Sequence, residues 1–207
     1  MPTISRVTKR TYTSELRARS ARETHAAVLR AAQELFTEQG YARTTIPAVA
    51  ARAGVAVNTV YTSVGGKAAL IAELTRAATS DDVIEATLAE ILALSDGRRI
   101  LERLAESTGV VMRRQETLIR VLLENATADP AVAGAAELSV RRYRERLSRI
   151  AAHLVTIGAV DGDAQRTEQV LWFYFGTSAW TTVSEFGWPE PEAAAWLATQ
   201  AAGALLT

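Results

Sequence analysis

The sequence predicts an all-α fold with a small N-terminal and a larger C-terminal helical domain. Apolar residues recur at the three- and four-residue spacing of helices along most of the 207-residue chain. Short breaks rich in Gly, Pro, Ser and Asp separate the helical segments. No alternating run of β-branched residues marks a strand, and hydrophobic residues make up 48% of the chain, which is ample for a core.

The first residues carry charge but show little periodicity. We interpret residues 1–19 as a flexible basic arm that contains Arg6, Lys9, Arg10, Arg17 and Arg19. Such an arm can contact phosphates or a minor groove, or it can be a solvated tail without contacts. The sequence does not separate these two interpretations.

Residues 20–66 predict a three-helix domain with a helix-turn-helix. The first helix, from about 20 to 39, ends at Gly40 and has an apolar face formed by Val28, Ala31, Ala32, Leu35 and Phe36. Thr45 is a good N-cap for a second helix to about residue 53, and a recognition helix follows over about 57–63. Gly54 between them tolerates the left-handed backbone of a sharp turn. The last helix can then enter a DNA major groove.

Residues 67–207 predict the larger helical domain. A long helix covers about 130–157, and the last two helices cover about 164–186 and 192–206. These last two helices are apolar on more than one face, which favours packing against a second copy of the chain. We therefore expect a dimer interface that includes Phe173, Phe175, Trp180, Trp196 and Leu197. Ordinary core packing within one subunit is the alternative.

Charge is distributed unevenly, although the formal net charge of the whole chain is zero. Residues 1–76 contain 11 Lys and Arg residues and 5 acidic residues, a formal charge of +6, and the remainder carries −6. A basic N-terminal region and an acidic body would orient the protein on nucleic acid before any base is read. An ordinary fluctuation of surface charge is the alternative, but the basic part coincides with the helix-turn-helix.

Several classes of protein are disfavoured. The chain has no cysteine, and its two histidines, His25 and His153, are far apart, so we expect no disulfide, metal site or cofactor. No nucleophile elbow or phosphate-binding loop marks an enzyme. No apolar run reaches the roughly 18–20 residues of a membrane span, and the N-terminus does not follow the signal-peptide pattern. We expect a soluble, cytoplasmic protein.

The N-terminal region resembles the DNA-binding domain of the TetR family of transcriptional regulators over roughly residues 20–75. The matching positions agree in order and spacing: Ala31, Ala32, Leu35, Phe36, Gly40, Tyr41, Thr44, Thr45, Ala53, Gly54, Val55, Tyr61 and Lys67. Ala56 stands where the family places a capping Ser or Thr, and Val64 stands where the family has Phe, followed by Gly65 and Gly66. These departures predict a looser segment after Tyr61 and an altered affinity for DNA.

The resemblance implies a homodimeric transcriptional regulator, expected to be a repressor that a small-molecule effector releases from a palindromic operator in double-stranded DNA. We expect DNA contacts from two groups of residues, Val57, Asn58 and Thr59 to bases, and Thr45, Tyr61, Lys67 and Arg43 to phosphates. Candidate ligand contacts combine an apolar body with a polar group: Met112, Gln115, Asn125, Tyr143, His153 and Trp172. The alternative is a helical ligand-binding or interaction module with a degenerate DNA-binding head.

Overall fold

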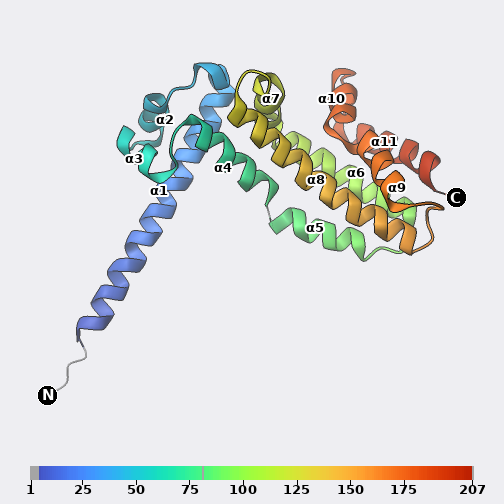
Figure 1. Ribbon diagram of the computed structural model, residues 1–207, viewed down its shortest axis with the longest axis horizontal. Coiled ribbons are helices and arrows are strands. Elements are labelled where there is room, and N and C mark those ends of the chain that lie inside the picture. Colours follow the sequence, from blue (N-terminus) through green and yellow to red (C-terminus); the bar gives the residue numbers. More distant parts are fainter. Residues whose placement is uncertain (1–4, 81, 207) are drawn as a thin grey trace. The chain divides into compact units, whose positions relative to one another are not determined.

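The computed structural model describes the backbone of residues 5–80 and 82–206, and the side chains of residues 15–80 and 82–206. Within these ranges the chain forms helices and turns without a strand, so the predicted all-α fold is confirmed (Figure 1). The helices are α1 (Ser5–Arg43), α2 (Ile46–Ala53), α3 (Val57–Ser63), α4 (Lys67–Thr79), α5 (Asp82–Leu92), α6 (Gly97–Arg114), α7 (Glu116–Asn125), α8 (Pro130–Thr156), α9 (Ala164–Phe175), α10 (Thr177–Glu185) and α11 (Glu190–Leu205). None of these helices is long and apolar enough, over its described residues, to cross a membrane.

The contacts divide the chain into two compact units. The N-terminal unit runs to Thr75 and also includes residues 120–135, and the C-terminal unit contains residues 76–119 and the chain from 136 onward. We had placed a domain boundary between residues 66 and 67. The contacts instead group the first part of α4, as far as Thr75, with the N-terminal unit, where the Lys67 Nζ also donates to the Ala42 carbonyl at 3.1 Å.

Helix α1 is longer than the sequence predicted. Of the expected flexible arm, residues 1–4 lie outside the described residues, whereas residues 5–19 continue the helix. The physical reason is that no Gly or Pro interrupts the chain between Thr3 and Gln39. Gly40, with φ 80° and ψ 161°, interrupts the helix in a backbone conformation that favours glycine.

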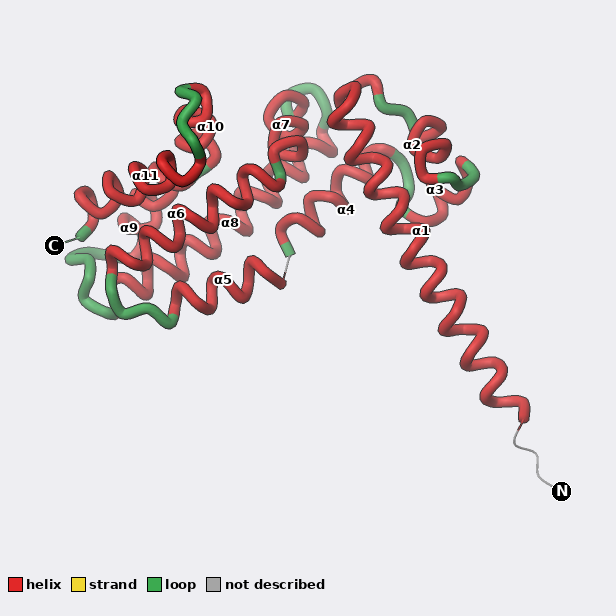
Figure 2. The backbone as a smooth tube through the Cα atoms, turned by 180° about the vertical axis from the view of Figure 1, so that it is seen from behind, coloured by secondary structure: helices red, strands yellow, loops and turns green. Residues whose placement is uncertain are grey.

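The C-terminal unit is built around α6, α9 and α11. Helices α6 and α11 lie side by side, and α9 packs against both (Figures 1 and 2). Their shared core includes the buried residues Leu101, Leu104, Leu171, Phe175 and Leu197. We had expected one helix over 164–186, but Gly176 separates α9 from α10 with an extended ψ of 163°. A Cβ atom at that position would stand only 2.4 Å from the Trp172 carbonyl oxygen, so the break requires glycine.

Candidate nucleic-acid interface

The turn between α2 and α3 has the geometry that the sequence predicted. The Thr45 side chain caps α2 by accepting a hydrogen bond from the Ala48 N–H at 3.3 Å. Gly54 ends α2 in the left-handed conformation, with φ 68° and ψ 30°. Its N–H and that of Val55 return to carbonyls of α2. Two short helices are thereby joined by a tight turn, as a helix-turn-helix requires.

Helix α3 is held by one side and exposed on the other. Val60 is fully buried and fixes the helix to the unit. Val57 is 40% exposed, Tyr61 is 54% exposed and Asn58 is exposed, whereas Thr59 is half-buried. The residues we assigned to base reading therefore lie at the start of an exposed helix, with Thr59 the least accessible of them.

The departures from the family pattern have structural counterparts. Ala56 precedes α3 without a side-chain hydrogen bond to the first turn, as expected for alanine. Gly65 has φ 108°, and a Cβ atom there would stand 3.0 Å from the Ala69 Cβ. The turn from α3 into α4 therefore favours glycine at position 65. The looser segment that we expected after Tyr61 stays a prediction.

Two of the expected phosphate contacts already have partners in the fold. The Lys67 Nζ lies 4.1 Å from the centre of the Tyr41 ring, in addition to its bond to Ala42. Burial lowers the pKa of Lys67, and the nearby charge of Asp129 opposes that shift. The exposed Arg43 donates from Nε to the Gln39 carbonyl at 2.7 Å. Both cations are thus positioned close to the end of α1.

Another cation of the unit is neutralised internally. Arg52 of α2 makes a two-point ion pair with Glu38, at 2.8 and 2.7 Å, and a further contact with Glu34 at 3.1 Å. The hydrogen bond from Arg52 lowers the pKa of Glu38. Arg52 therefore fixes α2 on α1, and its charge contributes little to the attraction of phosphates.

The candidate ligand contacts do not form one cluster. Tyr143, Trp172 and Met112 pack against the core of the C-terminal unit, where the Tyr143 hydroxyl lies 3.0 Å from the Thr108 Oγ1 and donates to the Phe175 carbonyl at 3.1 Å. Burial raises the pKa of Tyr143. The others are apart: His153 contacts the Leu94 carbonyl, Gln115 ends α6, and Asn125 belongs to the N-terminal unit and bonds within α7.

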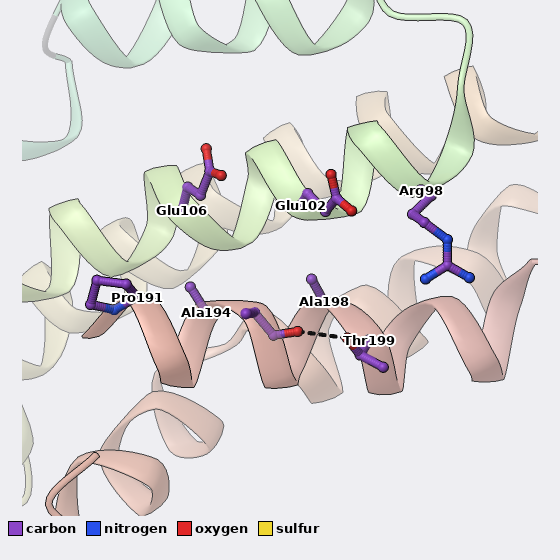
Figure 3. Close-up of a pocket in the computed structure, with 8 residues that line it drawn as sticks. Arg98, Glu102, Glu106, Pro191, Ala194, Ala198 and Thr199 are labelled. Carbon is purple, nitrogen blue, oxygen red and sulfur yellow. Dashed lines mark hydrogen bonds between the residues drawn. The ribbon is translucent and has the colours of Figure 1, made fainter. Parts of the chain in front are cut away.

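A groove of about 260 Å³ lies elsewhere on the C-terminal unit, between α6 and α11. Arg98, Glu102 and Glu106 line it from α6, and small residues line it from α11: Pro191, Ala194, Ala195, Ala198 and Thr199. Figure 3 shows the Arg98 side chain extending from α6 toward α11. None of the candidate ligand contacts lines this groove.

The predicted dimer residues divide into buried and exposed groups. Phe175, Trp180 and Leu197 are at most 3% exposed and belong to the core of their own subunit, so their side chains have no surface to offer a partner. This corrects our assignment of these three residues. Phe173 and Trp196 are exposed, by 72% and 43%. The Trp196 ring meets the Trp188 ring edge-on, with centres 5.4 Å apart, and the Trp188 ring in turn lies tilted against that of Phe186, also at 5.4 Å.

Residues 28–74 match the sequence model described as bacterial regulatory proteins of the tetR family. The predicted resemblance to the TetR family is confirmed. TetR-family regulators are DNA-binding proteins rather than enzymes, in agreement with the class we expected. A comparison with curated protein sequences gave no match.

Solved structures share the TetR-like fold over most of the chain. A protein from Mesorhizobium loti, described as a TetR-family transcriptional regulator, is 22% identical, with a TM-score of 0.73 over 89% of this chain and 95% of that chain. A transcriptional regulator from Saccharomonospora viridis, in complex with choline, is 17% identical with a TM-score of 0.73, over 89% and 98%. FadR from Bacillus subtilis, in complex with stearoyl-CoA, is 16% identical with a TM-score of 0.70, over 86% and 97%. At these identities the likeness shows the fold.

Proposed function

We propose that the protein is a cytoplasmic, homodimeric transcriptional repressor that a small-molecule effector releases from a near-palindromic operator. The observation that carries the proposal is the exposed start of α3, where Val57 and Asn58 face solvent while Val60 anchors the helix. An asparagine in this place can make two hydrogen bonds to an adenine edge in the major groove, and a valine can contact a thymine methyl group. The TetR-family match over residues 28–74 supports this use of α3.

The first test is DNA capture. Purified protein is mixed with sheared genomic DNA at two salt concentrations, and the retained fragments are sequenced. The proposal predicts enrichment of a near-palindrome whose half-sites are centred about one helical turn, or a multiple of it, apart. Retention without enrichment of any sequence, or no retention at low salt, would refute it.

The effector proposal rests on the C-terminal unit. The Tyr143 and Trp172 rings lie there with their centres 6.1 Å apart, and Met112 packs against the same core. They supply aromatic faces and a hydroxyl that are suited to a small organic molecule. The two solved structures named with ligands hold choline and stearoyl-CoA, which differ so much in chemistry that neither is assigned to this protein. Thermal unfolding with each compound as a probe, followed by release of the captured operator, tests ligand response directly.

For the dimer interface we now propose exposed aromatic side chains in place of the buried residues Phe175, Trp180 and Leu197. Phe186 and Trp196 are exposed large aromatic residues, and Trp188 lies between them. Exposed clusters of apolar side chains mark association surfaces, and a two-fold axis would use the same surface on both copies. We therefore place the partner subunit against Phe186, Trp188 and Trp196, which we name the aromatic series.

A second candidate function is a helical ligand-binding or interaction module whose head no longer binds DNA. Ala56 favours it, because α3 lacks the side-chain cap that stabilises its first turn. Under this function the DNA capture experiment yields no enriched sequence, while ligand-dependent stabilisation of the C-terminal unit persists. The two candidates therefore give opposite results in the same assay.

A further inference from the structure

Asp129, which lies far along the sequence, is connected to Lys67 through contacts with Tyr41. The Tyr41 hydroxyl donates to the Asp129 Oδ2 at 2.8 Å, and the Tyr41 ring lies beneath the Lys67 ammonium. Tyr41 is 6% exposed, and its ring also packs against Phe36 at 5.4 Å. All of these residues belong to the N-terminal unit, although Asp129 precedes α8 and is 88 residues from Tyr41.

The two carboxylate oxygens of Asp129 accept hydrogen bonds from two different helices. Oδ1 accepts from the Ala131 N–H at 2.9 Å and from the Val132 N–H at 3.4 Å, which caps the start of α8. Oδ2 accepts from Tyr41 and so fixes the tyrosine ring near the end of α1. The same side chain thus joins the beginning of α8 to the place where Lys67 is held.

The ring orientation matters to Lys67 because an ammonium has three N–H donors. One donor of Lys67 is directed to the Ala42 carbonyl, and the ring face of Tyr41 attracts the charge from another side. With two sides occupied, the remaining direction of the ammonium is fixed rather than averaged over many rotamers. A cation held in this way can meet a phosphate with little loss of side-chain entropy.

We propose that Asp129, a residue outside the helix-turn-helix, is a positioning residue of the DNA site and acts through Tyr41 on the phosphate contact of Lys67. The inference rests on the proposed function, since it requires that Lys67 contacts DNA. It adds residues 120–135 to the elements that shape the DNA-binding surface. It also makes the segment between α7 and α8 a determinant of affinity for all DNA sequences, because phosphate contacts carry no base information.

The test is the salt dependence of DNA affinity, measured by fluorescence anisotropy on one DNA fragment. Loss of one phosphate contact lowers the slope of log K against log salt by about 0.9, and by about twice that in a dimer with two heads. We compare wild type with Lys67→Ala, Tyr41→Phe and Asp129→Ser. Serine keeps the cap of α8 but is too short to reach Tyr41, and phenylalanine keeps the ring but loses the hydroxyl. Asp163→Ser is the matched control, because Asp163 caps α9 in the C-terminal unit in the same manner.

We expect Tyr41→Phe and Asp129→Ser to flatten the slope in the same direction as Lys67→Ala, and Asp163→Ser to leave it unchanged. In the Lys67→Ala background, Asp129→Ser should cause no further flattening, because its effect passes through Lys67. Asp129→Asn keeps the cap through its one amide oxygen and places its NH2 group where Oδ2 accepted from Tyr41. That NH2 group can donate to the Tyr41 hydroxyl oxygen, so the two side chains stay joined and the wild-type slope should be restored.

Two results overturn the inference while leaving the proposed function intact: an unchanged slope in Asp129→Ser, or an additive loss in the double variant. An Asp129→Asn slope equal to that of Asp129→Ser overturns the route through the tyrosine hydroxyl. A wild-type protein that binds no DNA refutes the proposed function and this inference together.

Discussion

Gly109 of α6 lies directly against the indole ring of Trp180. A Cβ atom built on Gly109 would stand 2.8 Å from the Trp180 Cη2 and 2.9 Å from the Glu190 Cγ. Helices α6 and α10 can therefore approach each other here only because position 109 has no side chain. Trp180 is 3% exposed as a result, and it stabilises the fold of the subunit.

Gly109→Ala should destabilise the C-terminal unit. The added methyl group collides with a buried ring and with the stem of Glu190, and such overpacking costs about 1–3 kcal/mol. Gly134→Ala is the matched control, because it lies within α8 and a Cβ there meets nothing within 4 Å. It should stabilise by about 0.5–1 kcal/mol through helix propensity. Urea unfolding measures both, and equal effects of the two substitutions would contradict the packing argument.

Trp196→Glu should disrupt the dimer, whereas Trp180→Glu should disrupt the fold of the subunit. A charge at the exposed Trp196 should leave the subunit folded but separate the dimer, since it enters a proposed interface twice across the two-fold axis. A charge at the buried Trp180 should unfold the C-terminal unit. Sedimentation and circular dichroism distinguish a folded monomer from an unfolded chain. Leu123→Glu, at a 59% exposed position on α7, should stay dimeric; a folded, dimeric Trp196→Glu protein would exclude this part of the aromatic series.

Asn58→Ala should weaken binding to the best operator by about 1–3 kcal/mol and change binding to random DNA very little. The loss should be specific because, under the proposed function, the side-chain amide reads a base edge. Thr62→Ala is a useful control on the same helix. The Thr62 hydroxyl donates to the backbone carbonyl of Asn58 at 3.0 Å, so its hydrogen is already used within the helix. Equal weakening of both complexes by Asn58→Ala, measured in competition titrations, would remove Asn58 from base reading.

The stability contributed by Asp129 should disappear in acid. The hydrogen bond from Tyr41, followed by that from the Ala131 N–H, lowers the pKa of Asp129 in the folded protein. A carboxylate with a lowered pKa stabilises the fold above its unfolded pKa of about 4, and this stabilisation is lost as the pH falls through the lower folded value. The difference in unfolding free energy between wild type and Asp129→Asn should therefore be present at pH 7 and shrink toward pH 3. A difference that does not vary with pH would show that the carboxylate charge is not involved.

Local signals were sufficient for the helix-turn-helix. The apolar spacing around Val28 and Phe36, the cap at Thr45 and the left-handed Gly54 each act within a few residues, so one short stretch of sequence specifies them. The same is true of the missing cap at Ala56. These features are confirmed as the sequence predicted them.

Features that depend on tertiary packing could not be predicted in the same way. The last two helices are apolar on several faces, so composition could not tell that Phe175 is fully buried and Phe173 is 72% exposed. The Tyr41–Asp129 bond joins residues 88 positions apart, and neither residue carries a local pattern that points to the other. The break at Gly176 follows from a close approach to the Trp172 carbonyl, which no helical period reveals.

The uncapped start of α3 has a consequence for how strongly the protein distinguishes its operator from other DNA. A helix of seven residues without a side-chain cap is marginal by itself, and its first turn contains Val57 and Asn58, which we assign to base reading. The turn is held by its backbone hydrogen bonds and by the packing of Val60. Under the proposed function only a complex that reads bases uses this turn, whereas a complex held by phosphate contacts does not. The missing cap therefore weakens the operator complex more than a complex with unrelated DNA, and it limits how strongly the protein distinguishes the two.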